Sequence, residues 1–168
     1  MVHSLDTFNA DALFDALGAN FSITPLSGRE ELKQYLDGET SNHAYGVVTS
    51  TGVWGIRLKT PPETLLGDAV PAPLLQLSVV VLHELILQRV LGITPEAMRS
   101  QSNLVYIEDD REVFDNVSNG SMQVGFVVKP TTVEQVRDIS QAGEVMPQKS
   151  TYFYPKIMTG LVMHKLDR

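Results

Sequence analysis

One stretch decides the fold of this chain: His43-Ala44-Tyr45-Gly46-Val47-Val48-Thr49-Ser50-Thr51-Gly52-Val53-Trp54-Gly55-Ile56-Arg57-Leu58-Lys59-Thr60. β-Branched and aromatic residues lie on both sides of Ser50-Thr51-Gly52, a turn that contains glycine, and this pattern predicts a β-hairpin. Along the second strand, Trp54, Ile56 and Leu58 alternate with residues of the opposite side. The alternation predicts a sheet that buries this face against the core.

Helices are predicted on the N-terminal side of the hairpin. Asn9 can cap a helix that ends at Gly18, where glycine would adopt the left-handed stop conformation. A short strand follows around Phe21. The sequence Ser27-Gly28-Arg29-Glu30 has the form of a capping box, in which serine and glutamate exchange hydrogen bonds at a helix N-terminus, and this helix should end at Gly38.

The C-terminal side repeats a rhythm of strands and helices. After a buried, strongly apolar helix at residues 77–92, the chain shows a strand at Leu104–Ile107, a helix capped by Asp109 or Asp110, and an apolar strand at Met122–Val128. A second capping box, Thr131 to Glu134, opens a last helix that should end at Gly143. This βαβα order predicts that the two strands are parallel neighbours.

The predicted fold class is therefore α+β. A mixed sheet, with the hairpin and a parallel βαβ-like portion, is covered by helices in a single domain that spans residues 1–168. That length suits one domain with one hydrophobic core.

Composition limits the function classes. The formal net charge of −7 argues against a general binder of nucleic acid or anionic membranes. The chain contains no cysteine, which excludes disulfides and thiolate chemistry. The first residues lack the basic and apolar regions of a signal peptide, and the longest apolar run is too short to span a bilayer, so a cytoplasmic location is expected.

Several catalytic and metal motifs are absent. His83-Glu84 resembles the start of a zinc-protease motif, but that motif needs a second histidine where Leu87 stands. The four histidines lack ligand spacing, and no metal site is predicted. The glycine-rich nucleotide loops and the nucleophile elbow are missing as well. Acidic residues at 109–112 are expected to complement the dipole of the helix that begins there.

The best candidate site is the stretch Met146–Lys156. Between two prolines it gathers side chains that can bind an anion and an adjoining flat group; these are Lys149, Ser150, Thr151, Tyr152, Tyr154 and Lys156. Lys129, at the junction between an apolar strand and a helix N-terminus, is added to this set because anions commonly bind at such junctions. Both features also have a structural explanation, as a well-anchored loop and as an ordinary capped helix.

A family resemblance rests on several segments. They are Lys129-Pro130-Thr131, Val133-Glu134-Gln135-Val136, Ala142-Gly143-Glu144, Met146 to Lys156, Thr159-Gly160-Leu161-Val162, Leu82-His83-Glu84-Leu85 and Leu91-Gly92-Ile93. In these segments the chain resembles domain-of-unknown-function family ten-fifteen, found in bacteria and archaea. The resemblance covers most of the chain, and its most specific part is the run from Met146 to Lys156.

The resemblance implies a longer protein. Members of the family are more than twice as long, and their earlier half carries an Asp-Gly-His-His-Arg motif and is similar to the ParB and sulfiredoxin group, which includes nucleotide-binding and phosphoryl-transfer proteins. This chain lacks that motif, so it is expected to be a C-terminal fragment. The resemblance supplies no catalytic residue to carry over, and neither a cofactor nor a reaction is predicted.

Two functions stay open at this level. In the first, the chain contributes one wall of a site for a phosphate-like or nucleotide-like anion, completed by the missing N-terminal half. In the second, it is a non-enzymatic structural or interaction module, whose aromatic loop packs against that half or against a second subunit, as in a homodimer.

Overall fold

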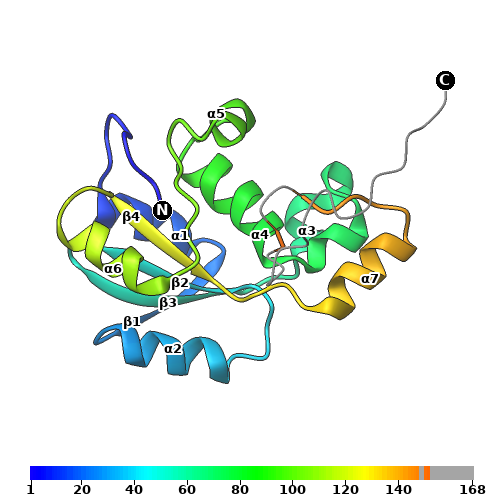
Figure 1. The fold of residues 1–168 in the computed structure, drawn as a ribbon, viewed down its shortest axis with the longest axis horizontal. Coiled ribbons are helices and arrows are strands. Elements are labelled where there is room, and N and C mark those ends of the chain that lie inside the picture. Colours follow the sequence, from blue (N-terminus) through cyan, green and yellow to red (C-terminus); the bar gives the residue numbers. More distant parts are fainter. Residues whose placement is uncertain (148–149, 152–168) are drawn as a thin grey trace, which may run out of the picture.

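The structure is a computed structural model that describes residues 1–147 and 150–151 (Figure 1). The strands are β1 (Phe21–Leu26), β2 (Ala44–Thr49), β3 (Gly52–Leu58) and β4 (Val124–Val128). The helices are α1 (Ala10–Gly18), α2 (Arg29–Gly38), α3 (Pro62–Leu66), α4 (Ser78–Val81), α5 (Pro95–Ser100), α6 (Asp110–Ser118) and α7 (Val133–Gln141). Two 3₁₀ turns, η1 (Gly67–Ala69) and η2 (Ala72–Gln76), precede α4, which continues as the π-helical segment η3 (Leu82–Val90).

The four strands form one antiparallel sheet in the order β1-β3-β2-β4. The predicted hairpin is confirmed: β2 pairs with β3, and Thr49 lies opposite Gly52. The connection is therefore the two residues Ser50 and Thr51, and Gly52 already belongs to β3. The α+β class and the cover of helices are also confirmed.

The parallel βαβ portion is wrong. β4 runs antiparallel to β2, with Tyr45 opposite Val128. Leu104 makes a single antiparallel bridge to Val2, and Val2 also bridges Val124. The N-terminal residues thus lie between the two segments that were expected to be neighbours. Apolar content marks a buried strand but does not encode which strand becomes its neighbour, and here β4 pairs with β2 on one side and with Val2 on the other.

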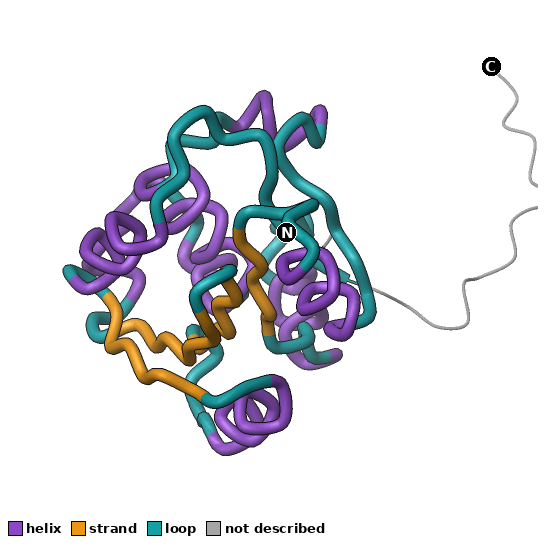
Figure 2. Tube along the Cα trace, turned by 90° about the vertical axis from the view of Figure 1, so that its left-hand side faces the viewer, coloured by secondary structure: helices purple, strands orange, loops and turns teal. Residues whose placement is uncertain are grey.

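The sheet separates two layers of helices, as Figure 2 shows with the helices on both sides of the strands. α2 and α6 cover one face and enclose a smaller apolar cluster around Leu32, Val48 and Val113. The opposite face carries the larger cluster, in which Tyr45 and Ile86 are fully buried. Residues along β2 alternate between the two clusters, as a strand with two buried faces requires.

Three glycines form the floor beneath α2 and α6. Gly46 lies opposite Gly55 in the pairing of β2 with β3. A Cβ on Gly55 would lie 2.5 Å from Tyr35 Cε1, and one on Gly46 would lie 2.6 Å from Leu32 Cδ2. On β4, a Cβ on Gly125 would overlap a γ-methyl group of Val113. The helices approach the sheet closely because these positions carry no side chain.

Helix 77–92 is confirmed as a buried element, since four residues of η3 are buried and Ile86 is 0% exposed. Its C-terminal part is wound as a π-helix, in which Leu91 N–H donates to Ile86 C=O at 2.9 Å. The sequence pattern did not predict this widening. In the part of the chain that the structure describes, no helix combines the length and apolarity needed to cross a membrane.

The N-terminal caps are partly as predicted. Asn9 accepts a hydrogen bond from Ala12 N–H and caps α1, although Ala19 continues beyond Gly18 in the right-handed conformation, so Gly18 is not a left-handed stop. The capping box at residues 27–30 is wrong: Gly28 is the N-cap of α2, and Ser27 donates to Glu31 instead of pairing with Glu30.

Candidate functional site

The junction between β4 and α7 places the ammonium group of Lys129 at the end of α2. Its Nζ donates to the carbonyl oxygens of Glu39 at 2.6 Å and Ser41 at 3.4 Å. A cation is favourable there because the last carbonyls of a helix carry partial negative charge. Lys129 therefore connects β4 to α2, on the α2 side of the sheet.

A hydrogen bond joins the two candidate stretches of the sequence. Thr131 Oγ1 donates to the carbonyl oxygen of Ser150 at 2.6 Å, across 19 positions of the chain. Ser150 Oγ donates to the carbonyl oxygen of Pro147 at 2.6 Å, and Ser150 is only 8% exposed. Thr151, the next residue, is exposed. Ser150 is thus anchored to Thr131, just before α7, and to Pro147.

The sequence-predicted site residues divide into two groups. Lys129, Ser150 and Thr151 are described by the structure. Four others lie outside the described residues; they are Lys149, Tyr152, Tyr154 and Lys156. Of the first group, Lys129 and the Ser150 hydroxyl donate to backbone carbonyls, whereas Thr151 has an exposed position.

The N-terminus of α7 carries a capping box one residue later than the sequence predicted. Thr132 Oγ1 accepts from Gln135 N–H, and Gln135 Oε1 accepts from Thr132 N–H at 2.9 Å. The box predicted from Thr131 to Glu134 is therefore wrong. Thr131 is left to bond to Ser150, and Gln135 Nε2 also donates to the carbonyl oxygen of Gln76. Backbone and hydroxyl hydrogen bonds at this cap lower the pKa of Glu134.

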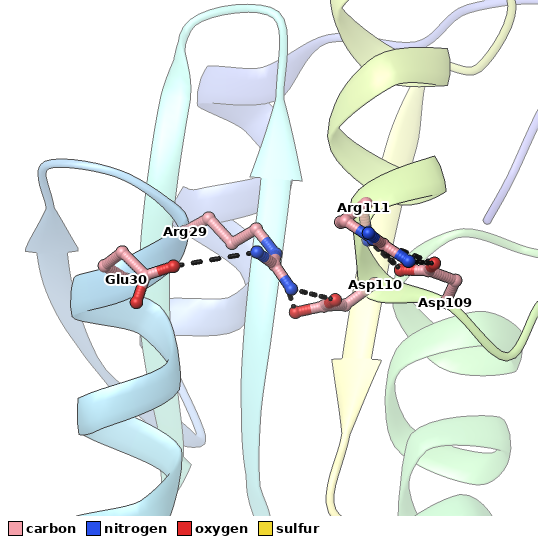
Figure 3. A network of polar contacts seen from close by, with 5 residues as sticks. All are labelled: Arg29, Glu30, Asp109, Asp110 and Arg111. Carbon is pink, nitrogen blue, oxygen red and sulfur yellow. Dashed lines mark hydrogen bonds and ion pairs between the residues drawn. The ribbon is translucent and has the colours of Figure 1, made fainter.

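A network of charged side chains lies where the N-termini of α2 and α6 meet (Figure 3). Arg29 donates to both carboxylate oxygens of Asp110, at 2.7 and 3.1 Å, and lies 3.6 Å from Glu30. Arg111 makes a second pair with Asp109, which also caps α6 through its hydrogen bond from Arg111 N–H. The predicted cap at 109 is confirmed.

Hydrogen bonds between the arginines and the aspartates shift pKa values in this network. The hydrogen bond to Asp110 raises the pKa of Arg29. Hydrogen bonds from the side chain and the backbone of Arg111 lower the pKa of Asp109 to about 2. Asp109 is thus charged throughout the physiological pH range. Sequence reasoning identified the acidic cap but missed Arg29, because its partner lies 81 positions away.

Two adjoining surface hollows flank this network. Both are lined by Arg29, Asp110, Val127, Val128 and Pro130. The first, of about 670 Å³, extends along residues 108–111, and the second, of about 290 Å³, extends along α2 to Lys129. Each contains both acids and bases, so neither is a simple anion-binding surface. The second hollow does reach one residue of the predicted site.

Two histidines are partly shielded from water. His83 Nε2 lies 3.5 Å from the Tyr106 hydroxyl, and burial lowers its pKa. Burial also lowers the pKa of His43, whose Nδ1 is buried and has no hydrogen-bond partner among the described residues. Within residues 1–147 and 150–151, no group of three or more histidine, aspartate and glutamate side chains is arranged to hold a metal ion.

The comparisons with protein families, curated proteins and solved structures found no match to this chain.

Proposed function

We propose that this chain contributes one wall of a site for an anionic ligand, with phosphate or a nucleotide as the chemical class. The wall consists of the β4–α7 junction, with Lys129 and Thr131, and of the stretch Met146–Lys156. The supporting observation is the hydrogen bond from Thr131 Oγ1 to the carbonyl oxygen of Ser150. It brings together the two stretches that the sequence selects independently for the same chemistry.

Cations and hydroxyls supply the donors. Lys129 uses two of its three N–H donors on carbonyl oxygens, which leaves one, and Lys129 also lines the second hollow. Lys149 and Lys156 flank Ser150 and Thr151 in the sequence. Charge-assisted hydrogen bonds from such groups are the usual means of binding phosphate. The rest of the site would come from the preceding half that the resemblance to family ten-fifteen implies.

The proposal is tested by titrating the chain with pyrophosphate and with ATP, in isothermal calorimetry and thermal unfolding. The double variant Lys149→Ala, Lys156→Ala should weaken binding about tenfold or more, because it removes two charged donors. Thr131→Val should weaken binding as well, since it breaks the contact that joins the two stretches. Unchanged affinity in both variants would contradict the proposal.

Lys59→Ala is the matched control for Lys129→Ala. Each lysine donates to a carbonyl oxygen at the C-terminus of a helix at 2.6 Å, Lys59 to Gly18 of α1 and Lys129 to Glu39 just past α2. Both substitutions should lower the melting temperature slightly. Only Lys129→Ala should reduce the affinity for pyrophosphate, and an equal effect of both would assign Lys129 a purely structural role.

The second function, a structural or interaction module, is favoured by one feature. Lys129 and Ser150 already donate to carbonyl oxygens of the chain itself, as expected for groups that anchor a loop. In that case neither anion would stabilise the unmodified chain. Thr131→Val would instead weaken association with a second subunit or with the preceding half. Sedimentation of the chain across a concentration range measures the first of these associations.

A further inference from the structure

The outer edge of β4 is paired over only part of its length. Val2 N–H donates to the carbonyl oxygen of Val124 at 2.8 Å. In return, Val124 N–H donates to the carbonyl oxygen of Val2 at 3.5 Å. The N–H and C=O groups of Val124 therefore face away from β2. Because these groups alternate along a strand, those of Phe126 and Val128 face the same way. Among the described residues, none forms a hydrogen bond with them.

The segment from residue 103 onward lies two strand spacings away from this edge, beyond Met1 to His3. Met1 exchanges two hydrogen bonds with Val105, at 2.8 and 3.0 Å, and Val2 bridges both Leu104 and Val124. Met1 to His3 is thus a short strand between β4 and the segment from residue 103 onward. With a spacing of about 4.8 Å between neighbouring strands, the segment lies about 10 Å from β4.

The space between β4 and the segment from residue 103 onward extends beyond Met1. Tyr106 packs against the larger apolar cluster and Ile107 against the smaller one, so this segment keeps the alternation of a strand in the plane of the sheet. Opposite it, Val128 is 40% exposed, unusual for a large apolar residue of this sheet. The hollow of about 670 Å³ lies in this region and is lined by Glu108, Val127 and Val128.

We propose that the open edge of β4 binds an extended peptide of a partner polypeptide as an added strand, antiparallel to β4 and in line with Met1–His3. The peptide backbone pairs with the outward groups of Phe126 and Val128, a recognition mode that uses main-chain hydrogen bonds for affinity. The peptide residue next to Met1 lies opposite Phe126. The peptide residue two positions further from Met1 lies opposite Val128.

Charge selects the side chains of this peptide. Arg29 and Arg111, the two cations of the hollow, are each paired with an aspartate. Glu108 is exposed and makes no ion pair with a described residue. A basic side chain opposite Val128 would lie beside Glu108, because Val128 and Glu108 line the same hollow. The partner therefore carries a lysine or arginine in an otherwise uncharged extended segment.

Hydrogen exchange of single amides, followed by NMR on the full chain, tests this inference. In the free chain, Phe126 and Val128 amides should exchange at least about tenfold faster than those of Gly125 and Val127, which pair with β2. A tethered probe, Lys-Thr-Val joined directly before Met1, should slow the two outward amides about tenfold. In the matched probe Pro-Thr-Pro, the proline next to Met1 has no amide N–H to donate to Phe126, so this probe should not slow them.

The source of the strand is tested with a separate peptide, acetyl-Thr-Lys-Thr-Val-amide. Saturable shifts of the Phe126 and Val128 amide resonances, weakened by Glu108→Lys, are expected. If the tether protects the two outward amides but the separate peptide does not bind, the added strand does not come from a partner. The edge would then be assigned to a segment of the same polypeptide. No protection by the tether would overturn the site itself. These readouts do not depend on anion binding, so the proposed function can fail independently.

Discussion

On the face of the sheet that α2 and α6 cover, three glycines leave room for the helices, whereas on the opposite face large side chains fill the space. Gly46, Gly55 and Gly125 bring the backbones together on the first face. On the second, Tyr45 and Ile86 are fully buried in the larger cluster. Substitutions that add atoms should therefore destabilise the fold on the first face, and substitutions that remove atoms should destabilise it on the second.

The largest effect is expected from removing volume on the large-residue face. Ile86→Ala should lower the free energy of unfolding by about 2–5 kcal/mol, because it leaves a cavity among buried neighbours. Urea denaturation measures the change. Val133→Ala, at a side chain that is 74% exposed, is the control and should stay within about 0.5 kcal/mol. If Ile86→Ala lowers the free energy of unfolding no more than this control does, the proposed difference between the two faces is wrong.

Adding volume to the glycine floor should have the next largest effect. Gly55→Ala should cost about 1–3 kcal/mol, because its Cβ would lie 2.5 Å from the Tyr35 ring, so the ring or α2 must shift. The same denaturation experiment applies. Gly18→Ala is the matched control, since a Cβ there meets no atom within 4 Å and the residue ends α1 without a positive φ. Equal stability of both variants would show that the floor does not need glycine.

The smallest effect concerns pH. Burial lowers the pKa of the Met1 amine from 8.0 to about 6, and the Met1 side chain packs against the glycine-floored cluster. The unfolded chain binds this proton below about pH 8 and the folded chain only below about pH 6. Stability should therefore increase by roughly 1–2 kcal/mol as the pH rises from 6 to 8.

Acetylation of the Met1 amine provides the control for this pH dependence. The acetylated chain has no titrating amine, so its stability between pH 7 and 8 should be nearly flat. At lower pH both forms should lose stability, because burial lowers the pKa of His83 and of His43. A slope between pH 7 and 8 that survives acetylation would assign the effect to other groups.

Local signals in the sequence predicted most elements. The hairpin, the buried helix at 77–92 and the caps at Asn9 and Asp109 depend on neighbouring residues, and the structure confirms them. The capping box of α7 was misplaced by one residue, whereas the box predicted at residues 27–30 does not form, because Gly28 is the N-cap of α2. At residues 131 and 132 two threonines stand side by side, and Thr132 caps α7 while Thr131 bonds to Ser150.

The candidate site was predictable as residue types but not as an arrangement. Lysines and hydroxyls in Met146–Lys156 and at Lys129 favour anion binding from their chemistry alone. The structure adds that Thr131 contacts Ser150 and that Lys129 bonds to the end of α2. Neither contact leaves a trace in local sequence, because the partners are 19 and 90 positions apart.

The sequence by itself determined the α+β class, the hairpin and the positions of the main helices, because periodicity and turn residues act over a few neighbouring residues. Tertiary structure alone decided the antiparallel direction of β4 and the insertion of Val2 beside it. It also decided the close approach of α2 to Gly46 and Gly55. The physical reason is that strand partners and helix–sheet distances depend on which distant surfaces fit together, and a local pattern records only which side of an element is apolar.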